Sequence, residues 1–313
     1  MDGESADGAV DRRIAAFVVN SSRVHDLRGF WHTCERAAAA RGLTPPLLLA
    51  TSTDDRLAEV AGRALKAGAG LVFAVGGDGT VRACAQALAG SGIRLAIIPR
   101  GSANLTANAL GIPPRLSHAL AVGFDGQDRR IDLATANGVP FAAMVGIGID
   151  AAVVDAASNS LKRFAGWPAY AAAAVSKLTR KPVSFAVQLD DAEPIRIAAR
   201  SVAVGNCGIL PGGFSIMPQA RLDDGQLDVA VLAPTGLLGW ASIGLRVILG
   251  SSNDDGQLQR HQAQHVEIHA DAECPRQIDG EVVEPGTSLT VRVLPDALFV
   301  RVPNQMRGGP RPG

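Results

Sequence analysis

The sequence predicts an α/β domain followed by a β-rich domain, in a chain of 313 residues. Residues 12–131 alternate short apolar runs with helical stretches, and residues 132–303 contain mostly strand patterns separated by turn signals. Hydrophobic residues make up 47% and charged residues 19%, which favours packed cores over disorder. We therefore expect two domains with these bounds, and flexible termini at 1–11 and 304–313.

The first domain reads as strands and helices in strict alternation. This spacing favours a parallel, doubly wound sheet, in which ligands bind at the carboxyl ends of the strands. The predicted strands are Ile14–Val19, Leu47–Ala50, Leu71–Val75 and Arg94–Ile98, and the predicted helices are His25–Arg41, Thr53–Lys66 and Thr80–Leu88.

The second domain starts with a hairpin signal, Asn137-Gly138, between strands Arg129–Ala136 and Val139–Ile147. Two helices are expected in it, near Ser160–Leu178 and Leu237–Leu249. The remaining predicted strands are Val183–Leu189, Ile195–Val204, Gln226–Leu232, His265–Ala270, Ser288–Val293 and Leu298–Val302.

Charge and apolar patterning limit the classes of function. Thirty Lys and Arg residues balance thirty Asp and Glu residues, so no overall charge favours nucleic acid as a partner. The start of the chain does not resemble a signal peptide, and the longest apolar run, Gly236–Gly250, is too short to span a bilayer. Four irregularly spaced cysteines indicate buried, reduced thiols. We expect a cytoplasmic protein that would meet a lipid only peripherally, at the inner membrane face.

The sharpest motif is Gly76-Gly77-Asp78-Gly79-Thr80, between a buried strand and a helix. Glycines permit close approach of a ligand, and a helix start offers free N–H groups that suit phosphate. An aspartate in such a turn can hold magnesium or order its waters. A tight turn without a ligand is the alternative, and no GxxxxGK[ST] P-loop occurs in the chain.

Val75–Thr80 resembles the nucleotide loop of the diacylglycerol kinase catalytic-domain family. This family includes bacterial soluble lipid kinases and the sphingosine and ceramide kinases, and it shares a fold with the NAD kinases. Further segments resemble the family's other motifs in the family's order, from about residue 14 to residue 302. They are Pro99–Leu105, Gly111–Pro113, Gly146–Asp150, Arg221–Asp228 and Gln277–Glu281.

The resemblance implies an N-terminal α/β nucleotide-binding domain and a C-terminal β-sandwich-like domain. It also implies magnesium-dependent transfer of the γ-phosphoryl group of ATP to a lipid hydroxyl, with diacylglycerol as the first candidate. Glu281 is grouped with the nucleotide-binding residues, although it could also support a base or be solvated. The implied nucleotide-binding residues are Asn20, Gly76, Gly77, Asp78, Gly79, Thr80, Gly101, Ser102, Asn104 and Glu281.

Four aspartates carry the implied chemistry. Asp78 and Asp132 match positions tied to the catalytic magnesium, and Asp224 matches a ligand of a second, structural magnesium. Asp279 matches the general base that accepts the proton of the lipid hydroxyl, with Asp78 as the other catalytic residue. Taken alone, Asp279-Gly280 also reads as a hairpin turn, and the segment around Asp224 also reads as a plain turn.

Alternatives remain open at this stage. A sphingoid base or another lipid could be the acceptor, and NAD kinases also use a GGDGT loop. Arg100 and Ala103 replace small residues of the family pattern, so a nucleotide- or lipid-binding protein without catalysis is a further reading. The helix near Leu161–Leu178 combines basic and aromatic residues that suit a membrane interface, or it is a buried domain helix. A homodimer is possible.

Overall fold

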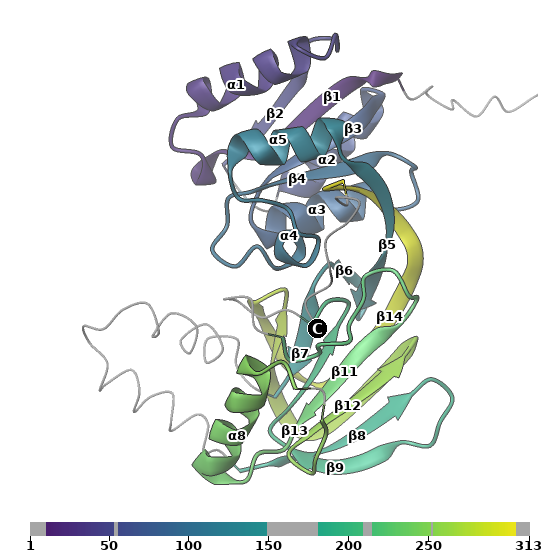
Figure 1. Cartoon of the computed structure of the whole chain (residues 1–313). Coiled ribbons are helices and arrows are strands. Elements are labelled where there is room, and N and C mark those ends of the chain that lie inside the picture. The colour runs from purple at the N-terminus through teal and green to yellow at the C-terminus, as the bar shows by residue number, and fades with distance from the viewer. Residues whose placement is uncertain (1–10, 53–55, 149–180, 209–214, 252, 305–313) are drawn as a thin grey trace, which may run out of the picture. The chain divides into compact units, whose positions relative to one another are not determined.

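The structure is a computed structural model that divides into two compact units (Figure 1). The first unit contains residues up to Ile131 together with those from Ala297 onward, and the second contains Asp132–Asp296. The sequence pattern had placed residues 297–303 in the second domain. In the structure Phe299 and Val300 pair with a strand of the first unit, which accounts for their place there. The structure describes residues 11–52, 56–148, 181–208, 215–251 and 253–304.

The first unit is built on a parallel sheet whose strand order is β4-β3-β1-β2. Its central strand β3 is almost entirely buried, which explains why its sequence is a continuous apolar run. The end of strand β14 adds to β4 in parallel. The predicted doubly wound α/β class is confirmed. The strands are β1 (Asp11–Asn20), β2 (Leu47–Thr51), β3 (Ala69–Gly76) and β4 (Arg94–Pro99).

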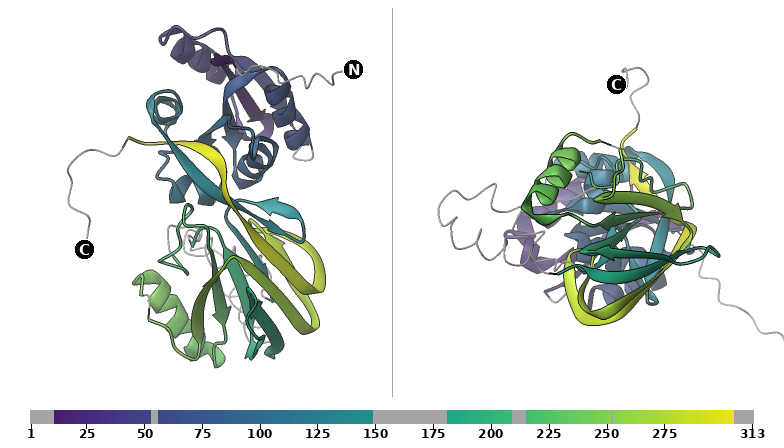
Figure 2. Two further views of the ribbon diagram at one scale, coloured as in Figure 1. Left: turned by 90° about the vertical axis from the view of Figure 1, so that its right-hand side faces the viewer. Right: turned by 90° about the horizontal axis from the view of Figure 1, so that it is seen from below.

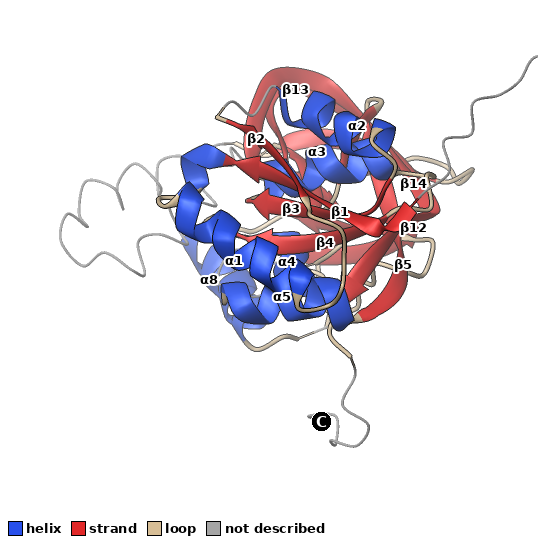
Figure 3. Ribbon diagram, turned by 90° about the horizontal axis from the view of Figure 1, so that it is seen from above, coloured by secondary structure: helices blue, strands red, loops and turns tan. Residues whose placement is uncertain are grey.

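Helices cover both faces of this sheet (Figure 3). Helices α1 (Leu27–Ala39) and α5 (Leu116–Asp125) lie on one face, and α2 (Leu57–Lys66) and α3 (Asp78–Leu88) lie on the other. The short helix α4 (Leu105–Ala109) follows β4. The sequence analysis missed α4 and α5.

Helix α5 was missed because it contains a glycine, which lowers intrinsic helix propensity. The structure gives this residue a packing role. A Cβ on Gly123 would lie 2.1 Å from Cε1 of Phe73, so only glycine lets α5 approach the sheet. The rings of Phe17 and Phe73 stack with centroids 4.3 Å apart, and Phe124 of α5 lies against Phe73. Tertiary packing therefore outweighs the local preference.

The second unit is mostly antiparallel, and its long hairpin of β13 and β14 is coloured yellow-green to yellow in Figure 2. The main path of the sheet runs β12-β11-β10-β7-β13-β14, while β8 pairs with β13 and β9. The predicted β-rich class is confirmed. The strands are β5 (Gln127–Ala136), β6 (Val139–Phe141), β7 (Met144–Ile147), β8 (Val183–Leu189), β9 (Ile195–Ala199), β10 (Ser201–Gly205), β11 (Leu227–Leu232), β12 (Leu258–Ala263), β13 (His265–Ile278) and β14 (Glu281–Val302).

Several predicted strands have different bounds in the structure. The predicted strand Val139–Ile147 is two strands, β6 and β7, and Ile195–Val204 is divided into β9 and β10 at Arg200. The two last predicted strands are parts of the single strand β14, and β12 was not predicted. Thr53–Asp55 and the predicted helix near 160–178 lie outside the described residues.

Helix α8 (Gly236–Ile248) packs on the second unit through Ile243, which lies against a cluster that includes Met217 and Leu258. The cluster is separate from the main core, to which β10, β11 and β13 contribute inward-facing residues together with other strands of the unit. Within the ranges that the structure describes, no helix combines the length and apolar character needed to cross a membrane. All four cysteines are buried and free, as predicted.

Candidate functional site

Two loops at the carboxyl ends of β3 and β4 pack directly on each other. A Cβ on Gly101 would lie 2.6 Å from Cα of Gly77, so the two backbones touch where any side chain would separate them. The amide of Arg100 donates to the carbonyl of Gly76 at 2.7 Å and closes the contact. The glycines of the two motifs therefore serve loop-to-loop packing. This packing sets both loops at the edge where doubly wound sheets bind ligands.

The first loop leads straight into α3. Gly77 is the N-cap residue and offers no side chain to the first amides of the helix. Uncapped amides and the positive end of the helix dipole suit an anion such as a phosphate group. Thr80 is buried one turn into α3, and a Cβ on Gly76 would clash with its hydroxyl oxygen at 2.1 Å. The loop therefore presents backbone amides rather than side chains at the start of α3.

Asp78 is the first residue of α3, and its Oδ1 accepts a hydrogen bond from the amide of Thr106 at 3.3 Å. This bond links α3 to the N-terminus of α4. Two helix N-termini next to one carboxylate stabilise its negative charge. Magnesium bound to nucleotides usually takes one or two protein carboxylates, with phosphates and water as its other ligands. Asp78 fits that donor set.

Asn104 holds the second loop in shape. Its φ of 48° lies in the left-handed region that asparagine tolerates. Its Oδ1 accepts from the amide of Gly101 at 2.8 Å, and its Nδ2 donates to the carbonyl of the same residue at 2.7 Å. Ser102 lies exposed in this loop. These bonds give Asn104 the task of holding the loop, and its predicted role toward a nucleotide stays a prediction.

Asn20 ends strand β1 and is buried. Its Oδ1 accepts hydrogen bonds from the amide of Ser22 at 3.1 Å and from the hydroxyl of Ser22 at 2.6 Å. Asn20 therefore caps the short 3-10 helix Ser21–Arg23. This structural role accounts for the residue's burial, and its role toward a nucleotide stays a prediction.

In the second unit, Asp279 occupies the two-residue turn between β13 and β14. Ile278 pairs with Glu281, and both Asp279 and Gly280 have positive φ values, 49° and 85°. These are features of a type I′ hairpin turn, which favours Asp-Gly. The hairpin reading of this motif is correct, and it is compatible with a chemical role.

The Asp279 carboxylate is 9% exposed and is held by backbone amides. Oδ1 accepts from the amides of Ala143 at 2.9 Å and Met144 at 3.1 Å, and Oδ2 accepts from the amide of Ala142 at 3.1 Å. These bonds explain the break between β6 and β7, because the amides of this segment face a carboxylate rather than a strand. They also fix the carboxylate in one orientation.

Asp132 is 2% exposed and joins four segments of the second unit. Its Oδ1 accepts from the amide of Asp296 at 2.8 Å, and its Oδ2 accepts from the amide of Gly225 at 2.7 Å. Its own amide donates to the carbonyl of Leu222 at 2.6 Å. The sequence analysis assigned Asp132 to a magnesium and water network. The observed bonds give it an additional structural task.

Asn206 was missed by the sequence analysis, although it connects both aspartates. Its side chain is fully buried, and its Nδ2 donates to the carbonyl of Asp132 at 2.7 Å. Its amide donates to the carbonyl of Ala143 at 2.9 Å, within the segment that holds Asp279. Its Oδ1 is buried without a hydrogen-bond partner in the part of the chain described. A polar residue directly after the fully buried strand β10 was the available signal.

Asp224 and Asp228 form an acidic pair at the start of β11. Asp224 is exposed, and its Oδ1 accepts from the amide of Gln226 at 3.0 Å. Asp228 is 6% exposed, and burial raises the pKa of its carboxyl to about 6, with a smaller raising effect from Asp224 and a lowering effect from a hydrogen bond with Gln262. Its Oδ2 is buried without a partner among the described residues.

The predicted site residues thus fall into two sets. Asp132, Asp224 and Asp279 belong to the second unit, Glu281 is exposed at the start of its strand β14, and the two loops with Asp78 belong to the first. The convergence of Asp78 and Asp132 stays a prediction. Among the described residues no three acidic, histidine or cysteine side chains group as metal ligands, so a cation would need phosphate, carbonyl or water ligands as well. Of Gly146–Asp150, Ile149 and Asp150 lie outside the described residues.

Comparison of the sequence with known proteins identifies the family to which the chain belongs. The diacylglycerol kinase catalytic domain matches residues 15–136, and the YegS C-terminal NAD kinase beta sandwich-like domain matches residues 143–302. A "probable lipid kinase YegS-like" of Pseudomonas aeruginosa (strain UCBPP-PA14) is 37% identical over 247 residues, which cover 77% of this chain and 79% of that protein. The chain belongs to the YegS-like diacylglycerol kinase family.

A second relative and a solved structure are also similar to this chain. A "probable lipid kinase YegS-like" of Pseudomonas fluorescens is 31% identical over 253 residues, which cover 79% of this chain and 83% of that protein. A crystal structure of a diacylglycerol kinase from Bacillus anthracis has the same fold, with a TM-score of 0.72 at 21% identity over 93% of this chain and 97% of the other. A kinase family implies the use of ATP.

We predict that Asp132→Asn lowers the free energy of unfolding by about 1–3 kcal/mol. Asparagine offers one acceptor oxygen where two amides now bond, so one half-buried N–H loses its partner. Urea unfolding monitored by fluorescence measures this loss. Asp191→Asn is the matched control, because the residue is exposed, and it should change stability by less than about 0.5 kcal/mol. Equal effects of the two variants would contradict a structural role for Asp132.

A second prediction concerns pH. The pKa of Asp228 lies above its unfolded value, so its favourable contribution is complete below about pH 4 and is lost as pH rises through about 6. The difference between 3.8 and about 6 corresponds to about 3 kcal/mol. Asp228→Asn should therefore remove a fall in stability of this order between pH 4 and pH 7. Urea midpoints of both proteins, measured with EDTA present, give the comparison, and parallel pH profiles would rule the effect out.

Proposed function

We propose that this protein is an ATP- and magnesium-dependent kinase that phosphorylates a lipid hydroxyl, with diacylglycerol as substrate and phosphatidic acid as product. The observation that carries the proposal is the pair of glycine-packed loops with Asp78 at the start of α3. This arrangement offers backbone amides for phosphates and one carboxylate for a cation. Family membership supports the kinase reaction, and the names of the Pseudomonas relatives support a lipid acceptor.

In the proposed mechanism each residue set has its own task. The amides of the GGDGT loop and the loop of Gly101, Ser102 and Asn104 bind the phosphates of ATP. Asp78 would hold magnesium, which would supply positive charge to neutralise the phosphates. Asp279 accepts the proton of the lipid hydroxyl. The hydroxyl oxygen then forms a bond to the γ-phosphorus, the bond to the bridging oxygen breaks, and ADP leaves with that electron pair.

The remaining assignments of the proposal follow from the same chemistry. Asp132 and Asn206 position the segments around Asp279, and Asp224 is proposed as a side-chain ligand of a structural magnesium, together with backbone carbonyls. Glu281, next to the turn of Asp279, is proposed to support the site from the start of β14. A lipid substrate places the protein peripherally at the cytoplasmic face of a membrane. A homodimer is a separate prediction that light scattering checks.

The first test is transfer of labelled γ-phosphate from ATP, with magnesium, to diacylglycerol in mixed micelles. Labelled phosphatidic acid is the expected product. Asp78→Asn should reduce turnover at least about 100-fold, because the amide keeps the hydrogen bond with Thr106 but removes the charge that holds the cation. Sphingosine, ceramide and NAD serve as competing acceptors. A labelled product with one of these instead would replace diacylglycerol, and ATP binding without any product would favour a binding protein.

A second test addresses the packed loops. Gly101→Ala should weaken ATP binding at least about tenfold, because its Cβ would push against the backbone of Gly77 and separate the loops. Gly62→Ala in α2 is the matched control, because a Cβ there meets no atom within 4 Å and alanine favours the helix. Isothermal titration with ATP measures both variants. Unchanged affinity in folded Gly101→Ala would show that ATP binds elsewhere.

A further inference from the structure

Helix α8 carries an apolar stripe on its exposed face. Leu238, Leu245 and Ile248 are 86%, 57% and 62% exposed, and Leu249, directly after the helix, is 71% exposed. The spacings of seven, ten and eleven residues between Leu238 and the other three place all four on one side of a helix. We call these four side chains the α8 stripe. The opposite side of α8 is also apolar, because Ile243 is buried and Trp240 and Val247 pack on the same cluster.

A helix that is apolar on both sides is usual only where both sides are covered. Single exposed leucines on a soluble protein need no explanation, whereas contiguous exposed apolar side chains mark an interaction surface. The α8 stripe therefore indicates a partner that is itself apolar.

A cavity of about 220 Å³ lies where α8 begins, and Arg200, Thr235 and Gly236 are among the residues that line it. Nε and Nη1 of Arg200 are buried and have no hydrogen-bond partner in the part of the chain described. Thr235 is the N-cap residue of α8, yet its side chain caps no amide. Arg200 and the positive end of the helix therefore both bring positive charge to the cavity, which favours a bound anion.

Charges around the cavity are segregated by sign. Val183 pairs with Ala199 at the open end of the β8–β9 hairpin. Lys181, just before Val183, and Arg200, just after Ala199, therefore both lie at this end, where the cavity is. The acidic residues of the hairpin are in its turn at the other end. None of the cavity's lining residues is acidic, and they are Pro182, Ala198, Ala199, Arg200, Ala233, Pro234, Thr235 and Gly236.

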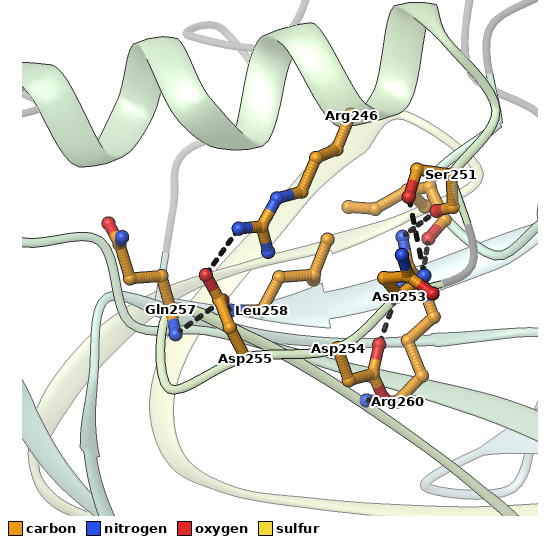
Figure 4. A network of polar contacts seen from close by, with 9 residues as sticks. Arg246, Ser251, Asn253, Asp254, Asp255, Gln257, Leu258 and Arg260 are labelled. Carbon is orange, nitrogen blue, oxygen red and sulfur yellow. Dashed lines mark hydrogen bonds and ion pairs between the residues drawn. The ribbon is translucent and has the colours of Figure 1, made fainter.

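The far end of α8 is neutral. Two aspartates lie there, and each is paired with an arginine, Asp254 with Arg260 and Asp255 with Arg246 (Figure 4). No acidic residue occurs in the sequence from Val229 to Asn253. The face formed by the α8 stripe and the cavity is therefore apolar, with positive charge at one end, and it is complementary to an anionic, apolar surface.

We propose that the α8 stripe and the Arg200 cavity form a membrane-docking face for anionic phospholipid. The stripe enters the acyl region of one leaflet, and the cavity binds the phosphate of a phospholipid headgroup. This inference rests on the proposed function, because an enzyme whose substrate is a membrane lipid must reach the bilayer. A second copy of the chain fits less well, since a stable interface takes roughly 20–30 residues a side and the stripe has four.

Sedimentation of the full-length protein with vesicles tests the docking face. One vesicle type is phosphatidylcholine alone, and the other is equal parts phosphatidylcholine and phosphatidylglycerol. Leu245→Glu should weaken binding to both types at least about tenfold, because a charge replaces an inserted apolar side chain. Arg200→Gln should weaken binding to the anionic vesicles alone, by about fivefold, since one basic residue near an anionic surface contributes about that factor. Arg200→Lys should restore most of it.

Leu65→Glu is the matched control for the stripe. Leu65 is an exposed leucine on helix α2 of the first unit, so its replacement should leave vesicle binding unchanged. Phosphorylation of a short-chain, soluble diacylglycerol separates this inference from the proposed function. Leu245→Glu and Arg200→Gln should keep wild-type turnover on that substrate. On anionic vesicles, turnover at limiting lipid should fall in both variants, by about the same factors as their binding.

Three outcomes would overturn the docking face. Equal vesicle binding by wild type and Leu245→Glu would show that the α8 stripe does not contact the membrane. Equal binding by wild type and Arg200→Gln on anionic vesicles would show that the cavity does not bind a phospholipid headgroup. A dimeric wild type that Leu245→Glu converts to a monomer, with vesicle binding unchanged, would assign the stripe to a second copy. A wild type that binds vesicles through α8 yet phosphorylates no lipid would instead contradict the proposed function.

Discussion

The bonds between the Asp279 carboxylate and the amides of residues 142–144 are the interaction on which the second unit's site depends. A buried carboxylate is costly unless it is hydrogen-bonded, and here the backbone supplies the donors. The same bonds end β6, start β7 and fix the hairpin turn of Asp279-Gly280. Asp132 on β5 repeats this arrangement, because its carboxylate accepts hydrogen bonds from the amides of Gly225 and Asp296. Asn206 connects both arrangements.

In the first unit the corresponding constraint is close packing at glycines, where any side chain would push two segments apart. Gly77 and Gly101 touch through their backbones, and Gly123 lets α5 close on Phe73. The first contact packs two loops against each other, and the second packs a helix against the core of the sheet. One residue type thus has two functions, and only the place of each glycine in the fold distinguishes them.

Much of the architecture was predictable from the sequence, because buried parallel strands have continuous apolar runs and amphipathic helices follow them. The failures have local causes. Helix α5 contains Gly123, which lowers helix propensity. Residues 139–147 form an unbroken apolar run, although the amides in its middle bond to Asp279 some 136 residues later in the chain. Asn206 looks like an ordinary loop residue, because its partners are far away in the sequence.

The sequence by itself determined the family, the two-domain order and the identities of the candidate site residues, because glycines and aspartates at fixed spacings carry chemistry that other residues cannot supply. The tertiary structure decided what each of those residues touches. Asp132 and Asp279 accept hydrogen bonds from backbone amides, and Asn104 holds its loop. The four side chains of the α8 stripe are exposed to solvent. The physical reason is that hydrogen bonds and burial join residues far apart in the chain, and spacing along a sequence does not encode such distances.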